Sequence, residues 1–197
     1  YVLSGLGYSA AFFVDDRSET LSFGQLSHFS SIIYHNGGWM DHGSLSVVQA
    51  LENAALMGKG LIFLGDDSAF HASGTQSQHG TAAMFDLMGF ASYSSNGSSG
   101  TVTVANSTHP VIDGPMGTVG SFSYIADIDD ASAASGSDVL MVKGAAPAVI
   151  ATEDGSSRRV TINMRLNNSS DCPSGATSVP PEMETLFHNA LLWAEWN

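Results

Sequence analysis

The chain has 197 residues, of which 43% are hydrophobic and only 13% charged, so it is long enough for one domain with a sizeable core. Its formal net charge is −13. An acidic field of this size disfavours nucleic acids and other polyanions and favours a cation or a neutral sugar as partner. The only cysteine, Cys172, excludes an intramolecular disulfide and a thiolate metal cluster.

Composition also bears on location. Scarce Lys and abundant Ser, Gly and Asn indicate an exported protein, so we expect a secreted, extracellular chain. No apolar run is long enough to span a membrane. Four Asn-X-Ser/Thr sequons are candidate glycosylation sites in a host that glycosylates: Asn96, Asn106, Asn167 and Asn168.

The first segment has the pattern of a helix end over Tyr1–Tyr8, followed by a strand over Ala10–Val14 and by Asp15 and Asp16. In an α/β domain a helix of this kind normally follows a first strand. We therefore expect residues 1–197 to form a single domain that is a fragment, a processed chain, or one whose first strand another chain supplies. A short helix is expected over Leu21–His28.

The stretch from Ser30 to Asp67 predicts one βαβ unit. It contains a strand over Ser31–His35, a helix over about Ser44–Met57 and a strand over Leu61–Leu64. Both strands are continuous apolar runs, which is typical of parallel strands covered on both faces. The predicted fold class is therefore α/β, a flavodoxin-like three-layer domain with a mostly parallel central sheet.

The second half of the chain predicts antiparallel additions to that sheet. A helix over about Gln78–Met88 precedes a flexible turn at Ser94–Gly100, and Ala126–Ser137 reads as an acidic loop. A last helix is expected over Glu182–Trp196, with a core face that includes Met183 and Leu186. Short strands are expected at Thr101–Ala105, Ser121–Ile125, Asp138–Lys143, Pro147–Thr152 and Arg159–Met164.

Five stretches, in their order and spacing, resemble a known superfamily. They are Leu6–Tyr8, Gly58–Gly65, Thr108–Gly114, Arg158–Asn163 and Phe187–Ala194. The pattern is similar to that of the class I glutamine amidotransferase-like superfamily, and within it to the ThuA-like and non-catalytic branches. The resemblance implies a flavodoxin-like three-layer domain with an added β-rich segment.

The chain departs from this superfamily where catalysis takes place. Its amidotransferases carry a nucleophilic cysteine after the strand that matches Leu61–Leu64, where this chain has Gly65-Asp66-Asp67. Their His and Glu partners follow a late strand, where this chain has Met164-Arg165-Leu166-Asn167. The resemblance therefore implies a pseudoenzyme. Since ThuA-like proteins tend to keep a histidine near these strand ends, their activity is not expected either.

Four carboxylates are predicted to meet at the carboxyl ends of the parallel strands, where an open α/β sheet binds its ligands. Asp66 and Asp67 join Asp15 and Asp16 there, and the four side chains are candidate ligands of Ca²⁺ or Mg²⁺. The alternative is that each pair caps a helix or a turn, as Asp commonly does. No other cofactor is expected.

Catalytic candidates at this edge are weak. Asp66 and Asp67 are an acid/base pair if a histidine such as His71 lies close. Ser68 follows Gly65 one residue out of register with the G-x-S-x-G pattern of a serine nucleophile. The Asp127-Ile128-Asp129-Asp130 stretch resembles half of a calcium loop but lacks its Gly and distal Glu, which favours a plain acidic loop.

Ligand-binding candidates are Asn36 and Trp39, which follow the strand Ser31–His35, together with Asp66 and Asp67. Trp39 is either an aromatic platform for a sugar ring or a lid over the βαβ unit. Three functions stay open: a non-catalytic binding or structural module, a ThuA-like carbohydrate enzyme, and a subunit of an extracellular assembly that completes an unpaired sheet edge.

Overall fold

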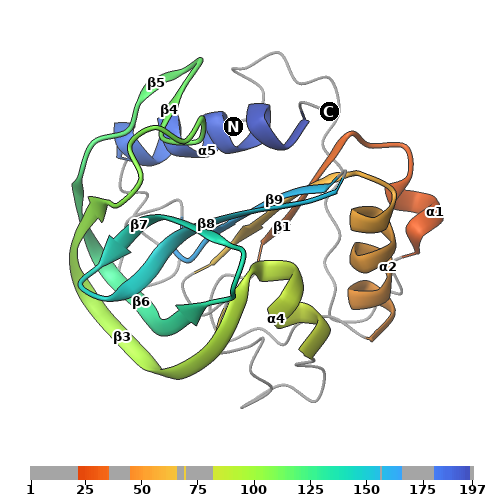
Figure 1. Cartoon of the computed structure of the whole chain (residues 1–197), viewed down its shortest axis with the longest axis horizontal. Coiled ribbons are helices and arrows are strands. Elements are labelled where there is room, and N and C mark those ends of the chain that lie inside the picture. The colour runs from red at the N-terminus through yellow and green to blue at the C-terminus, as the bar shows by residue number, and fades with distance from the viewer. Residues whose placement is uncertain are drawn as a thin grey trace, which may run out of the picture.

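The computed structural model describes residues 22–35, 45–65, 69, 82–155, 157–165 and 180–195. In chain order the elements are α1 (Phe23–Leu26), β1 (Ser31–His35), α2 (Leu45–Leu56), β2 (Gly60–Leu64), α4 (Ala82–Met88), β3 (Phe90–Val104), β4 (Asp113–Gly114), β5 (Gly117–Thr118), β6 (Phe122–Ala133), β7 (Asp138–Lys143), β8 (Ala146–Asp154), β9 (Ser157–Ile162) and α5 (Pro181–Glu195). Helix α5 covers one face of the main sheet, and α2 and α4 cover the other (Figure 1). The chain is therefore an α/β, flavodoxin-like three-layer domain, as the sequence predicts.

The main sheet has seven strands in the order β1-β2-β9-β8-β7-β3-β6. Strands β1, β2 and β9 are parallel to one another. The remaining neighbours, from β9 to β6, pair antiparallel. The parallel βαβ unit is thus confirmed, and the antiparallel additions extend the sheet on the β9 side, so the sheet is mixed and not mostly parallel as predicted.

The position of β2 between two helical layers explains why its sequence, GLIFL, is apolar throughout. All five of its residues are buried. Ile62 and Leu64 face the cluster formed with α5, whereas Leu61 and Phe63 face the cluster formed with α2 and α4. A strand covered on both faces has no side that favours polar residues.

Helix α2 packs an apolar face against the sheet, and a glycine ends the helix. Gly58 has φ +76°, a left-handed conformation that glycine adopts without steric cost. The Gly58 N–H donates to the Ala55 carbonyl at 2.9 Å, and the Lys59 N–H donates to the Ala54 carbonyl at 2.9 Å. The buried side chains of α2 include Val47, Val48, Leu51, Ala54 and Ala55.

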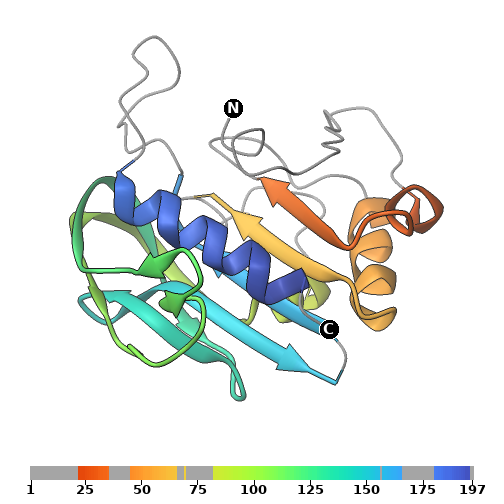
Figure 2. The ribbon, with the colours of Figure 1, turned by 90° about the horizontal axis from the view of Figure 1, so that it is seen from above.

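Helix α5 crosses the opposite face of the sheet over β2 and β9 (Figure 2). Its predicted core residues are all buried: Met183, Leu186, Phe187, Ala190, Leu191 and Trp193. The helix lies so close to β2 that a Cβ on Gly60 would fall 2.5 Å from the Ala194 carbonyl oxygen. Glycine is therefore required at the start of β2 by close approach of the two backbones.

Two stretches behind the family resemblance contact each other. Asn189 of α5 is fully buried, and its side chain bridges the β4–β5 hairpin. Its Oδ1 accepts from the Met116 N–H at 3.0 Å, and its Nδ2 donates to the Gly117 carbonyl at 2.9 Å. A Cβ on Gly114 would fall 2.5 Å from the Asn189 Oδ1. These residues hold the hairpin against α5, which is a structural role.

Two predictions in the antiparallel part are wrong. Ser94–Gly100, expected to be a flexible turn, lies inside β3, and most of the expected acidic loop Ala126–Ser137 lies inside β6. The two strands pair with each other through several register shifts and curve round the end of the sheet in Figure 1. Pairing at long sequence separation outweighs the local preference of Gly, Ser and Asp for turns.

Candidate functional site at the carboxyl edge of the parallel strands

The parallel strands end side by side. His35 pairs with Leu64, and Leu64 pairs with Ile162, so the last residues of β1, β2 and β9 form a row. The Gly65 N–H, just after β2, donates to the Ile162 carbonyl at 3.2 Å. The turns that follow β2 and β9 therefore start next to each other, at the edge where α/β sheets bind ligands.

The segment after β9 is held by hydrogen bonds and burial. The Asn163 N–H donates to the Ala148 carbonyl at 2.9 Å, and Met164 is fully buried. The Arg165 N–H donates to the Tyr124 hydroxyl at 2.7 Å. Backbone and side chain thus fasten this turn to β8 and β6.

The Asn163 side chain lies inside the protein, with 1% of its surface exposed. Its Nδ2 donates to the Asp129 carbonyl at 3.3 Å and lies 3.5 Å from the Pro147 carbonyl. Within the described part of the chain, its Oδ1 has no hydrogen-bond partner. Because an unsatisfied buried acceptor costs free energy, this amide oxygen is suited to a donor on a neighbouring segment of the chain.

Most of the predicted site residues lie outside the described residues. This holds for the strand-end candidates Asn36, Trp39, Asp66, Asp67, Ser68 and His71, for Asp15 and Asp16, and for Asn167, Asn168 and Cys172. Gly65 and His35, which immediately precede two of these segments, lie at the carboxyl edge. The ligand, catalytic and metal assignments of these residues therefore stay predictions.

Asn106 is the sequon whose side chain the structure describes, since the side chain of Asn96 lies outside the description. The Asn106 Oδ1 accepts from the Thr108 N–H at 3.2 Å and from the Thr108 hydroxyl at 3.1 Å. This is an Asx turn closed by its own threonine. Glycosylation at the four sequons stays a prediction.

The structure bears on metals and membranes only in part. Within the described ranges, no group of three or more His, Cys, Asp or Glu side chains is placed to hold a metal ion. The stretch Asp127–Asp130, expected to be an acidic loop, is part of β6, and Asp129 is fully buried there. Among the described helices, none has the length and hydropathy needed to cross a bilayer.

His109 stabilises its own turn and contacts α5. Its Nδ1 accepts from the Val111 N–H at 3.2 Å, and its ring lies edge-on to Trp193 with centroids 4.8 Å apart. The Arg158 guanidinium lies over the Trp193 ring, 5.4 Å from the ring centroid. Burial lowers the pKa of His109, opposed by the carboxylates of Asp138 and Glu153.

His188, a residue of α5 that sequence reasoning did not single out, is also buried. Burial lowers its pKa, and the Glu184 carboxylate one turn earlier opposes the shift. Its Nε2 has no hydrogen-bond partner among residues 22–35, 45–65, 69, 82–155, 157–165 and 180–195. A histidine inside an otherwise apolar helix face carries no sequence signal that distinguishes it from a core residue.

Comparison with known proteins identifies the fold. Neither protein-family models nor curated proteins give a match. A ThuA-like protein from Parabacteroides merdae superposes with a TM-score of 0.60 at 13% identity, over 99% of this chain and 82% of that one. A cytoplasmic protein of Salmonella typhimurium gives 0.64 at 13% identity, over 91% and 77%. Another, from strain LT2, gives 0.57 at 14% identity, over 91% and 74%.

The chain therefore has a ThuA-like, glutamine amidotransferase-like fold. The prediction of an exported, extracellular protein is contradicted, because the two Salmonella neighbours are described as cytoplasmic. The composition that suggested export has a structural explanation: strand β3, FASYSSNGSSGTVTV, concentrates Ser and Gly in a paired strand. The many Ser and Gly residues of this stretch therefore belong to the surface of a sheet that carries few charged side chains.

Proposed function

We propose that this protein is a non-catalytic binding module that holds a small neutral ligand at the carboxyl edge of β1, β2 and β9. The observation that carries the proposal is the segment Asn163-Met164-Arg165, which follows β9 directly beside Gly65. In the family that the chain resembles, this position supplies the His and Glu partners of the nucleophile. Here its residues are fastened into the fold.

The chemistry of these three side chains supports binding over catalysis. A neutral amide and a thioether do not accept a proton near pH 7, and a guanidinium does not release one. General acid–base catalysis needs a group whose pKa lies near the working pH. Asn163 and Met164 are also buried, so neither reaches a substrate in the turn.

The ligand class follows from charge and from the candidate residues. A net charge of −13 disfavours anionic ligands and has little effect on a neutral polyol. Amide and carboxylate oxygens hydrogen-bond to hydroxyl groups, and an indole packs against the apolar face of a sugar ring. Asn36, Trp39, Asp66 and Asp67 would supply these contacts, which makes a neutral carbohydrate the leading ligand class.

Two assays on the full chain test the proposal. Ammonia release from glutamine is expected to stay at background, and a panel of neutral mono- and disaccharides is titrated while line broadening of the sugar signals is followed by NMR. Trp39→Ala is expected to weaken sugar binding about tenfold or more by removing the stacking surface. Trp39→Phe keeps an aromatic ring and should retain most of the affinity.

The outcomes are separable. Glutamine turnover, or sugar turnover that Asp66→Asn or Asp67→Asn abolishes, would show an enzyme and overturn the non-catalytic reading. Sugar binding that Trp39→Ala leaves unchanged would remove the carbohydrate site from this edge. Sugar binding without turnover, sensitive to Trp39→Ala, is the expected result.

A further inference from the structure

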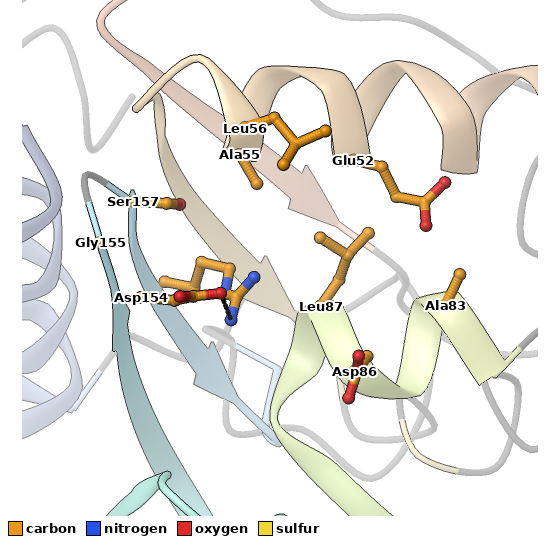
Figure 3. A pocket seen from close by; sticks show the side chains of 10 residues that line it. Glu52, Ala55, Leu56, Ala83, Asp86, Leu87, Asp154, Gly155 and Ser157 are labelled. Carbon is orange, nitrogen blue, oxygen red and sulfur yellow. Dashed lines mark ion pairs between the residues drawn. The ribbon is translucent and has the colours of Figure 1, made fainter.

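A pocket lies at the opposite end of the parallel strands from the carboxyl edge. It is an open pocket with a volume of about 350 Å³, lined by α2, α4 and the turn between β8 and β9 (Figure 3). Gly155 and Ser157, at the amino end of β9, form its floor on the sheet side. Pockets of 300 to 1,000 Å³ commonly accept ligand groups, so this one is large enough for a long side chain.

The charge of this pocket is mainly negative. Glu52 of α2, Asp86 of α4 and Asp154 of β8 line it, with Arg159 as the one cation among its lining residues. The Arg159 Nη2 lies 3.9 Å from the Asp154 Oδ2, which offsets the charge of that pair. Among the ion pairs of the described residues, none includes Glu52 or Asp86. The pocket therefore keeps two unbalanced carboxylates.

The wall and rim of the pocket are apolar and exposed. Leu56 lines it and is 79% exposed, and Met57, the next residue, is 66% exposed. Elsewhere in the described ranges, the large hydrophobic side chains that are exposed are Met116 and Ile125. Two of these four side chains are thus adjacent, at the end of α2. Adjacent exposed apolar side chains beside a pocket mark an interaction surface.

We propose that this surface, the α2–α4 groove formed by Glu52, Leu56, Met57, Asp86 and Leu87, docks a segment of a partner protein. That segment presents a Lys or Arg side chain between apolar side chains. The basic group enters the pocket toward Glu52 and Asp86, and the flanking apolar groups cover Leu56 and Met57. Charge complementarity carries the choice of a basic segment over an acidic one.

The charge of the chain argues against other occupants. A second copy carries −13 as well, and four of its six basic side chains are already engaged: Lys143, Arg158 and Arg159 in ion pairs, and Lys59 with the Ser27 carbonyl at 2.9 Å. Nucleic acids and anionic membranes are repelled by the same acidic field. The groove is at the other end of β9 from the proposed sugar site, so either proposal can fail without the other.

The test uses a short probe peptide, acetyl-Ala-Leu-Lys-Leu-Ala-amide, titrated into the ¹⁵N-labelled full chain. Amide shifts are expected in residues 52–57, 83–87 and 154–159. Leu56→Ser is expected to weaken binding about tenfold by removing buried apolar area. Glu52→Gln and Asp86→Asn should each weaken it roughly two- to threefold, the size of an exposed ion pair. Glu184→Gln removes the same charge from an exposed position of α5, away from the groove, and should leave affinity unchanged.

Several results would overturn the proposal. One is a peptide with Glu in place of Lys that binds as well as the probe. Another is a loss from Glu184→Gln equal to that from Glu52→Gln, which would indicate a diffuse charge effect. Amide shifts outside the groove would place the peptide on another surface. Dimers that form as the protein concentration rises, and that Leu56→Ser abolishes, would show that the groove binds a second copy of the chain. Met57→Ser, at a second exposed position, serves as the test if Leu56→Ser lowers the melting temperature.

Discussion

Strands β1, β2 and β9 and the pair β3–β6 belong to one sheet, yet they are stabilised in different ways. Strand β2 is buried on both faces and has no exposed residue, and most residues of its parallel neighbour β9 are buried, whereas β1 at the edge is half-buried. The β3–β6 pair is rich in Ser, Gly and Asp, and most of the described side chains of β3 are exposed or half-buried. The parallel strands depend on apolar burial, whereas β3–β6 depends on pairing and on polar contacts across the two strands.

The polar contacts of β3–β6 are specific. Ser92 and Ser132 share a hydrogen bond at 2.7 Å, and the Ser94 hydroxyl donates to the Asp130 carbonyl at 2.9 Å. The Lys143 ammonium donates to the Ser98 carbonyl at 2.7 Å and to the Ile128 carbonyl at 3.1 Å. The bonds to the Asp130, Ser98 and Ile128 carbonyls satisfy backbone groups where the register shifts interrupt the ladder. One sheet thus combines a half that is stabilised mainly by apolar burial with a half that is stabilised mainly by hydrogen bonds.

The largest expected effect is in the parallel half. Phe63→Ala removes a fully buried ring that contacts Tyr34, and we expect it to lower the free energy of unfolding by about 3–5 kcal/mol. Urea denaturation followed by circular dichroism measures the loss. Leu56→Ala, at a side chain 79% exposed, is the control and should change stability by less than about 0.5 kcal/mol. Equal losses would contradict the role of burial.

The next effect tests close pairing in β3–β6. A Cβ on Gly97 would overlap the Ile128 carbonyl oxygen, so Gly97→Ala forces the two strands apart. We expect a loss of about 3 kcal/mol, as for an overpacked site. Gly100→Ala is the matched control, because its Cβ would meet only the Lys143 Cγ at 3.4 Å. Thermal unfolding of both variants decides, and similar melting temperatures would count against tight pairing at Gly97.

Lys143→Met tests the hydrogen-bonded half more gently. It keeps the length of a side chain that is 12% exposed but removes the donor for the Ser98 and Ile128 carbonyls. We expect a loss of about 2 kcal/mol from the unsatisfied acceptors. Asp130→Asn removes the charge of the 3.9 Å ion pair but keeps an amide oxygen that can accept from the Ser95 hydroxyl, and it should cost well under about 1 kcal/mol. Urea denaturation compares the two, and the reverse order would show that the charge pair dominates.

The smallest effect concerns the histidines packed with α5. Burial holds the pKa of His109 and of His188 below the ordinary 6.5, so the folded state binds fewer protons than the unfolded state near that pH. Their contribution to stability is complete above pH 6.5 and is lost as the pH falls from 6.5 toward the lowered folded values. His109→Gln and His188→Gln should flatten the fall in melting temperature between pH 7.5 and 5.5.

An unchanged pH slope in both variants would contradict this account of the histidines. His28→Gln is a suitable control, since this exposed histidine lies between α1 and β1, away from α5. A slope that flattens equally in His28→Gln would show that any lost histidine charge has the same effect, and that burial is not the cause.

Much of the fold could be predicted from local patterns. The apolar runs of β1 and β2, the helical face of α2 with Gly58 at its end, and the core face of α5 all follow from periodicity and capping. The β3–β6 pair could not, because Gly97 and the Asp127–Asp130 stretch favour turns locally and become strand only through each other. Of the site, the sequence located the carboxyl edge but not the burial of Asn163.

The amino-acid sequence is enough to predict the class of the fold, the carboxyl edge of the parallel strands and the absence of a cysteine after β2. These depend on properties of single segments: periodicity, chain direction and residue type. Three features emerge from tertiary packing alone: Asn163 and Met164 are buried after β9, Asn189 holds the β4–β5 hairpin, and the exposed Leu56 lines a pocket with Glu52 and Asp86. Each of these features depends on which segments, far apart in the sequence, come into contact. The conformational preferences of single segments do not determine those contacts.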